Sequence, residues 1–343
     1  MDFDRRALLV GSMAVALSGC GRSTAGKAAV KEMRTDRPRL EGWAPFKTAF
    51  LAPEGRIVDT GNNGISHSEG QGYGLLFAEA AGDRGAFDRM LDWTQKTLAR
   101  PYDALYAWRY APHEPTPVSD PNNATDGDML IAWALMRAGD RWGEAQYHDR
   151  AATIRAAIAD HCVRRVGGRT LLLPGVNGFD KPDLTTVNMS YYVWPALDRF
   201  RMVEDEPVWQ DVTAQGETLL DEARTGAHAL PTDWTDVPVA GPVAPAADKP
   251  PRFGFDAVRV PLYLAMGDRP QKAESMARFW QHYADQGQDI PAWVDVISGE
   301  RAPYALSTGG YAVVRRVLGR DVPHNAPPQK DYYSSALELL AHL

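Results

Sequence analysis

The chain has 343 residues, a length that exceeds one ordinary domain but that a barrel can use as a single unit. Hydrophobic residues make up 44% and charged residues 24%, as in soluble globular proteins. The net charge is −7 and no basic run occurs beyond the N-terminus, so the composition argues against a nucleic-acid partner.

Residues 1–20 have the pattern of an export signal. A charged start is followed by an apolar stretch at residues 7–17, which is too short for a stable membrane span. The arginine pair at residues 5–6 loosely resembles a twin-arginine signal. Residues 17–20, LSGC, resemble a bacterial lipobox, in which cleavage leaves Cys20 as the lipid-carrying first residue. A plain cleaved signal with a chance cysteine is the alternative.

Residues 21–39 are small, polar and charged, and they predict a tether ahead of a single domain at residues 40–343. Gly21 stands where an Asp is associated with retention at the inner membrane. The expected location is therefore the periplasm, with a lipid anchor in the outer membrane. Cys162 is the only other cysteine, so acylation of Cys20 leaves no internal disulfide.

An acid among glycines stands at residues 67–74, HSEGQGYG, directly before the apolar run LLFAEAA. Ser66 and Glu69 have the S-x-x-E spacing of a capping box, which would explain the Glu as a helix start. The capping box leaves three glycines unexplained, since each costs a helix about 1 kcal/mol relative to Ala. Their spacing matches no phosphate-binding loop. We therefore expect a ligand to approach this segment closely, with Glu69 in a concave site.

Apolar and amphipathic segments alternate along the rest of the chain, as expected for buried helices and the helices that cover them. The apolar segments are residues 74–81, 128–138, 189–197, 255–266 and 306–318. The amphipathic segments that follow them are residues 87–99, 145–165, 208–223, 272–286 and 332–343. A further segment at residues 43–50 forms a first pair or meets the last helix. The total of about six pairs predicts a ring of inner helices wrapped by an outer ring.

Further acids stand at the starts of two apolar segments. Asp126 and Asp128 flank Gly127, and a helix N-cap is the structural alternative for either acid. Asp256 and Arg259 lie three residues apart on one helical face, where an exposed ion pair is the alternative. Most of the residues around this second pair are apolar, so its face is not expected to be solvated. A buried acid and arginine in one cavity favour a catalytic or binding role.

These blocks resemble glycoside hydrolase family 8. Residues 124–142, ATDGDMLIAWALMRAGDRW, fit the family signature at every defined position, and SEGQGYG, NMSYY and DAVRVP resemble further blocks in the right order. The resemblance runs from about Trp43 to the C-terminus and implies an all-α fold, the (α/α)6 barrel, with no cofactor and no metal. Two details depart from the common pattern. Met189 replaces the usual Pro, and residues 237–252 are unusually rich in Pro and Ala, which we interpret as a surface loop and not a linker.

The resemblance also implies roles for individual residues. Glu69 matches the general acid and Asp256 the general base. Asp126 matches the invariant signature acid, which is either a nucleophile or a residue that holds the sugar beside the scissile bond. The residues expected to contact substrate are Arg259, Tyr191, Tyr73 and, as a stacking platform, Trp108.

The implied function is an inverting endo-β-1,4-glucanase, a cellulase that cuts cellulose-like β-glucan beside the cellulose synthase machinery of bacteria. Chitosanase, lichenase and xylanase activities belong to the same family and remain alternatives. A non-catalytic envelope lipoprotein that binds glycan is the alternative of another class. The presence of all three acids counts against it, because binding alone would need only the aromatic residues.

Overall fold

The computed structural model describes residues 40–203, 207–326 and 330–343. The predicted export signal, with its arginine pair and lipobox, and the predicted tether lie outside the described residues. No helix within the described part is long and apolar enough to cross a membrane.

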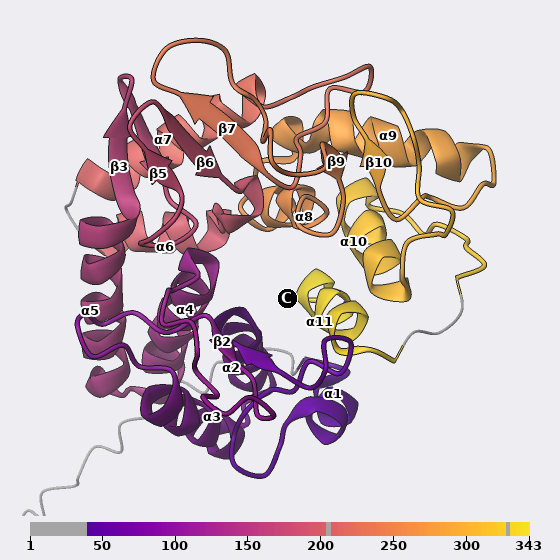
Figure 1. The fold of residues 1–343 in the computed structure, drawn as a ribbon. Helices are drawn as coiled ribbons and strands as arrows, with labels where there is room; N and C mark the ends of the chain where they lie inside the picture. Colours follow the sequence, from indigo (N-terminus) through magenta and orange to yellow (C-terminus); the bar gives the residue numbers. More distant parts are fainter. Residues whose placement is uncertain (1–39, 204–206, 327–329) are drawn as a thin grey trace, which may run out of the picture. The chain divides into compact units, whose positions relative to one another are not determined.

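Helices dominate the described part of the chain, and one set of them forms a closed ring (Figure 1). The members of this set are α2 (Ser68–Ala81), α4 (Thr125–Trp142), α6 (Trp194–Val203), α8 (Arg259–Met266), α10 (Thr308–Leu318) and α11 (Tyr332–Ala341). Each of these helices contacts the next one in this order, and α11 contacts α2. The ring is thereby closed by elements from the two ends of the described chain.

A second set of helices packs against the ring from outside. Its members are α1 (Trp43–Phe50), α3 (Arg84–Thr97), α5 (Ala145–Cys162), α7 (Pro207–Glu222) and α9 (Glu274–Asp285). Helix α3 packs on α2, α5 on α4, α7 on α6 and α9 on α10, whereas α1 packs on both α11 and α2. Two short 3-10 helices, η1 (Met189–Tyr191) and η2 (Pro270–Ala273), precede α6 and α9. The two sets confirm the predicted (α/α)6 barrel.

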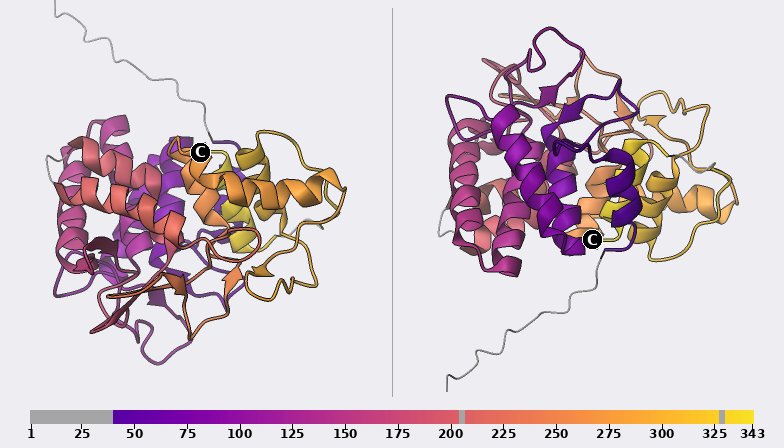
Figure 2. Two further views of the ribbon diagram at one scale, coloured as in Figure 1. Left: turned by 90° about the horizontal axis from the view of Figure 1, so that it is seen from above. Right: turned by 90° about the horizontal axis from the view of Figure 1, so that it is seen from below.

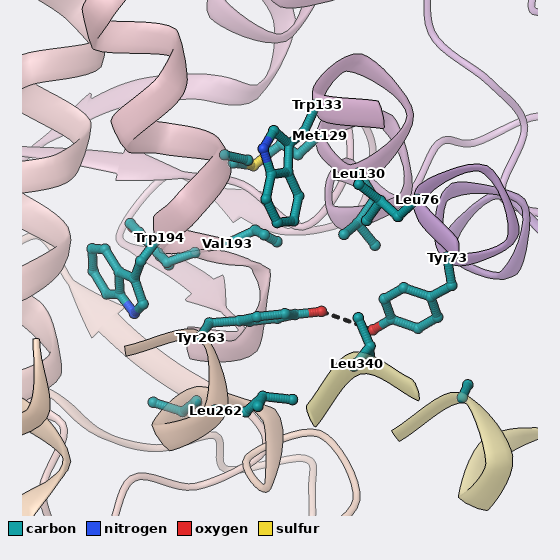
Figure 3. Close-up of a cluster of buried hydrophobic side chains, with 14 of the residues drawn as sticks. Tyr73, Leu76, Met129, Leu130, Trp133, Val193, Trp194, Leu262, Tyr263 and Leu340 are labelled. Carbon is teal, nitrogen blue, oxygen red and sulfur yellow. Dashed lines mark hydrogen bonds between the residues drawn. The ribbon is translucent and has the colours of Figure 1, made fainter. Parts of the chain in front are cut away.

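The last helix does not follow the prediction. The sequence pattern places α11 in the outer, amphipathic set, but α11 packs between α10 and α2. Its Leu340 is fully buried and lies beside Tyr73 and Tyr263 in the centre of the ring (Figure 3). Ser334 can be buried in α11 because its hydroxyl accepts the backbone N–H of Gly309 at 3.0 Å. Helix α1 covers α11, so the first helix meets the last.

The burial of α2 and α4 follows from their sequences. Residues 125–136 of α4 are buried without interruption, as expected for a segment that is apolar nearly all round. Both helices end at a glycine in the left-handed conformation, Gly82 with φ 74° and Gly143 with φ 70°. Glycine adopts this conformation without the steric penalty of a Cβ, so these residues stop the helices.

Short strands, which the sequence pattern did not predict, connect the helices. Three antiparallel pairs are β1 (Ser66–His67) with β2 (Arg109–Tyr110), β3 (Val163–Val166) with β4 (Arg169–Leu172), and β9 (Arg252–Phe253) with β10 (Val294–Asp295). An antiparallel sheet contains, in order, β5 (Asp180–Lys181), β6 (Leu184–Val187), β7 (Thr235–Pro238) and β8 (Ala244–Pro245). Thr185 of β6 faces Val237 of β7. The strands gather at one end of the helical ring (Figure 2).

The Pro/Ala-rich segment at residues 237–252 differs from its prediction. It is not a surface loop throughout, because it contains the end of β7 and all of β8, which pairs with the first residues of β7, and β9 begins at its end. The intervening residues 239–242 are exposed. Prolines at the ends of β7 and β8 are compatible with these strands, since short strands leave several backbone N–H groups outside the ladder.

The glycines of SEGQGYG are explained by packing within the protein. A Cβ added at the first, second or third of them would lie 2.9, 2.5 or 2.8 Å from a protein atom. At Gly72 the nearest atom is Cβ of Leu130 in α4, and a Cβ on Gly127 of α4 would lie 2.2 Å from Ser68 Oγ. The expectation that a ligand requires these glycines is therefore wrong. Gly72 and Gly127 allow α2 and α4 to approach closely, which brings the starts of the two helices together, whereas Gly70 makes room for Tyr332 and Gly74 for Ile57 and Met90.

Candidate active site

Glu69 is the second residue of α2, where the chain passes from β1 into the helix. His67 is the N-cap, and its Nδ1 accepts the backbone N–H of Gly70 at 3.0 Å. The capping-box alternative is wrong, because Ser66 Oγ donates to the Ile57 carbonyl at 2.6 Å. The Glu69 carboxyl is thus not used to cap its own helix.

Arg259 of α8 links Glu69 to Asp256. Its Nη1 contacts Glu69 Oε1, and its Nη2 donates to Asp256 Oδ1 at 2.6 Å. Nη2 also donates to Ser190 Oγ at 2.9 Å. Only 4% of the Arg259 side chain is exposed. Two acids that are distant in sequence therefore share one buried guanidinium, whose fork of donors can bond both at once.

Tyr73 lies one helical turn after Glu69 and is fully buried. Its hydroxyl donates to Glu69 Oε1 at 3.0 Å and lies 2.8 Å from the Tyr263 hydroxyl (Figure 3). Burial and the neighbouring Tyr263 raise the pKa of Tyr73 well above its usual value, so the hydroxyl keeps its proton. Tyr73 was expected to contact substrate. In this structure Tyr73 has no exposed surface, and its contact with the site is the hydrogen bond that its hydroxyl donates to the Glu69 carboxyl.

Asp256 stands in the turn before α8, with 32% of its side chain exposed. Desolvation of the carboxyl and the charges of Asp233 and Asp126 raise the pKa of Asp256 to about 8. The Asn188 side chain acts in the opposite direction, and the Arg259 guanidinium at 2.6 Å also favours the anion. The carboxyl therefore has a high proton affinity, and the Arg259 contact is the interaction that favours its ionised form.

Asp233, two residues before β7, is a site residue that the sequence did not predict. Its Oδ1 accepts the backbone N–H groups of Gly254, Asp256 and Ala257 at 3.1, 3.1 and 2.8 Å. Burial raises the pKa of Asp233 to about 6 in spite of these bonds. Its only sequence signal is an Asp beside a Trp in TDW, with no spacing that relates it to Asp256.

Asp126 and Asp128 lie in the first turn of α4, and neither side chain caps the helix. Asp126 Oδ1 accepts the backbone N–H of Gly127 at 2.8 Å, and burial raises the pKa of Asp126 to about 7. Asp128 is fully buried and accepts the Tyr106 N–H and the Asn123 amide, each at 2.9 Å. Asp126 influences the pKa of Asp256 and belongs to the site. Asp128 instead holds the loop residues Tyr106 and Asn123 through hydrogen bonds.

Tyr191 lies beside these acids, and a stacked aromatic pair lies next to Tyr191. Tyr191 in η1 lies near two of them, since burial and the charges of Asp126 and Asp256 raise the pKa of its hydroxyl well above the usual value. The Tyr191 ring is 6.2 Å from that of Trp234, which stacks on Phe179 with ring centroids 5.7 Å apart and planes at 4°. The sequence did not predict this stacked pair.

Trp108 is half-buried and attached to the start of α2. Its indole Nε1 donates to Asp120 Oδ2 at 2.7 Å, and its carbonyl accepts the backbone N–H of Ser68 at 3.0 Å. The ring is thus held beside the helix that carries Glu69. Among the described residues, no group of three or more potential ligands could hold a metal ion.

Comparison with known proteins finds a matching family and similar sequences. The family model for glycosyl hydrolases family 8 matches residues 23–343. A probable endoglucanase from Novacetimonas hansenii is 41% identical over 307 residues, covering 88% of this chain and 89% of the relative.

Solved structures of similar proteins agree with the fold. The family 8 endoglucanase Cel10 from Klebsiella pneumoniae superposes with a TM-score of 0.83 at 39% identity, covering 88% of this chain and 97% of that one. The endo-β-1,4-glucanase CMCax from Acetobacter xylinum gives a TM-score of 0.82 at 41% identity, with 88% and 95% covered.

Proposed function

This chain belongs to the glycosyl hydrolases of family 8, and we propose that its three acids carry out an inverting hydrolysis of β-1,4-glucan. The protein is a glycoside hydrolase of the endo-1,4-β-glucanase type, as its relatives with 39–41% identity are. The single observation that supports the assignment of roles is the shared guanidinium. Glu69 on α2 and Asp256 in the turn before α8 meet at Arg259, with Asp126 close by.

In the proposed mechanism Glu69 protonates the departing glycosidic oxygen and Asp256 removes a proton from the attacking water. Asp126 holds the sugar beside the scissile bond. The raised pKa of Asp256 makes its carboxylate a stronger base, and the contact with Arg259 favours that ionised form. Tyr191, near Asp126 and Asp256, can orient the water or the sugar through its protonated hydroxyl.

Arg259 also limits the acid, because a guanidinium beside Glu69 favours the carboxylate over the protonated form. Glu69 can act as an acid only if substrate binding weakens this contact. The glycosidic oxygen can take the place of the guanidinium at Glu69 Oε1, while Asp256 retains Arg259. Substrate binding would thereby leave Arg259 paired with Asp256, the proposed base, and would allow Glu69, the proposed acid, to carry a proton.

The anomer of the first product tests this function. An inverting site holds its two carboxyls about 6.5–9.5 Å apart to admit a water, whereas a retaining site holds them about 5–5.5 Å apart. Proton NMR of a fresh hydrolysate of a soluble β-1,4-glucan should show the α-anomer first. An initial β-anomer, or a sugar trapped covalently on Asp126, would make Asp126 the nucleophile and contradict the proposed roles.

Substrate class within the family is tested by a panel of cellulose derivatives, mixed-linkage glucan, chitosan and xylan. We expect the largest release of reducing ends from the cellulose derivatives. Preferential cleavage of chitosan, mixed-linkage glucan or xylan would replace the cellulase assignment with that activity. No release from any of them, together with measurable binding, would favour a glycan-binding lipoprotein.

Trp108 is proposed as a platform on which a glucose ring stacks. Trp108→Ala is expected to weaken the binding of long glucan chains by about 1–3 kcal/mol, because aromatic surface is removed from the contact. Isothermal titration with cello-oligosaccharides measures this change. The melting temperature should change little, since the ring is only half-buried. A large loss of stability without a loss of affinity would identify Trp108 as a structural residue.

We further propose that the protein is exported to the periplasm, anchored to the outer membrane through Cys20 and employed beside the cellulose synthase machinery. The lipobox LSGC and the apolar stretch before it support the anchor. Multiple acyl chains are sufficient for firm attachment, whereas a single chain is marginal. Cys20→Ala should move the protein from the membrane fraction to the soluble fraction. Unchanged membrane association would exclude lipidation as its cause.

A further inference from the structure

The turn that carries Asp256 lacks a capping group of its own. Helix α8 starts at Arg259, and its N-cap residue Val258 makes no side-chain cap. The backbone N–H groups before a helix have no partner within that helix and must be satisfied from elsewhere. Three of them, from Gly254, Asp256 and Ala257, converge on a single oxygen of Asp233.

Asp233 is itself held in place. Its backbone N–H donates to the Arg252 carbonyl at 2.7 Å, next to the pairing of β9 with β10. A Cβ added at Gly254 would lie 2.7 Å from Asp233 Oδ2, so the glycine at this position leaves the space that the carboxylate occupies. The carboxylate is thus held by three backbone N–H donors, and one of these belongs to Asp256 itself.

We propose that Asp233 is the positioning residue for the base of the reaction, because it both holds the backbone of Asp256 and places a fixed negative charge beside its carboxyl. This inference rests on the proposed role of Asp256. The two effects are separable, since the hydrogen bonds need only an acceptor oxygen, whereas the electrostatic effect needs a charge. An Asn at position 233 can supply the first without the second.

The charge of Asp233 acts on Asp256 together with groups from every neighbouring element. Those facing Asp256 are Glu69 of α2 through the shared guanidinium, Asp126 of α4, Asn188 and Tyr191 at η1, Arg259 of α8 and Tyr333 of α11. Asp233 contributes more to the raised pKa of Asp256 than Asp126 does. Above about pH 6 Asp233 is itself ionised, so its effect is present where the base titrates.

The test compares two substitutions across pH, with kcat/KM on soluble cello-oligosaccharides measured from pH 4 to pH 10. The acidic limb of this profile reports the ionisation of the base in the free enzyme. In Asp233→Asn the limb should move to lower pH by roughly 1 unit, because an ionised Asp256 no longer faces that charge. Plateau kcat and the melting temperature should stay close to those of the original protein.

Asp233→Ala should show the same shift and, in addition, a plateau kcat lower by about 10-fold or more and a lower melting temperature, because three backbone N–H groups lose their acceptor. Asp236→Asn is the matched control. Asp236 is also buried but accepts from Thr186 Oγ1 and the Ala247 N–H, away from the turn, so its profile should not move.

The outcomes separate this inference from the proposed function. If Asp256→Asn is inactive but the acidic limb stays in place in both Asp233 variants, Asp233 is only a structural cap and the inference is wrong. If Asp233→Asn loses as much plateau kcat and stability as Asp233→Ala, an acceptor oxygen alone does not hold the turn, so the two effects are not separable and the inference is overturned. If Asp256→Asn remains active, the assignment of the base has failed first.

Discussion

Glu69→Gln and Asp256→Asn are each expected to lower kcat on β-1,4-glucan by about 10²–10⁴-fold, the usual contribution of a general acid or base. Gln cannot protonate the leaving oxygen, and Asn cannot accept a proton from water. Neither change alters the size of the side chain, and each amide can still accept a hydrogen bond from Arg259. Reducing-end release measures kcat, and circular dichroism and thermal unfolding verify the fold.

The matched control is Glu274→Gln on the outer helix α9. Glu274 is 67% exposed and pairs with Arg278 on the same helix, so its loss should leave kcat unchanged. A folded Asp256→Asn protein with near-normal kcat would mean that another group activates the water. If Asp126→Asn alone removed all activity while the other two variants retained it, the roles of the three acids would have to be reassigned.

Gly72→Ala is expected to destabilise the protein by about 1–3 kcal/mol or more, because a Cβ there would lie 2.5 Å from Leu130 Cβ. The contact is between two rigid ring helices, so relief requires α2 and α4 to move apart. Since these helices carry Glu69 and Asp126, activity should fall together with stability. Urea unfolding measures the free energy, and kcat measured well below the melting temperature reports the geometry.

Gly85→Ala on the outer helix α3 is the control for the glycine substitution. The nearest atom to an added Cβ at Gly85 is 3.9 Å away, and the residue lies in the first turn of the helix. Alanine favours helix over glycine, so this change should be neutral or slightly stabilising. Equal destabilisation by both substitutions would mean that helix propensity or chain entropy, and not the α2–α4 contact, determines the effect.

The helices and most of the acids could be predicted because their signals are local. An apolar segment of eleven residues predicts α4 by itself, and the apolar surroundings of Asp256 and Arg259 indicate that the pair is not solvated. The strands could not be predicted, since segments of two to four residues are too short to show alternation. The inward position of α11 depends on a bond between Ser334 and Gly309 that periodicity does not reveal.

Three other features escaped prediction because the sequence does not show which residues meet in the fold. Asp233 binds backbone N–H groups, which almost every residue possesses, so nothing in the sequence marks its partners. Gly72 marks a close approach but not what approaches. The sequence suggested a ligand, and the neighbour is Leu130 of α4. The stacked Phe179 and Trp234 likewise meet only through the fold.

The closure of the helical ring has a kinetic consequence. The Tyr332 N–H donates to Thr60 Oγ1 at 3.2 Å across a separation of 272 residues, close to where α11 meets α2. Neighbouring helix pairs can form from local contacts, but such distant contacts wait until nearly the whole chain is ordered, which slows folding. The meeting of Glu69 with Arg259 also spans much of the ring. A partly folded chain can therefore be rich in helix while Glu69 and Asp256 remain apart, so we expect activity to appear only after the ring has closed.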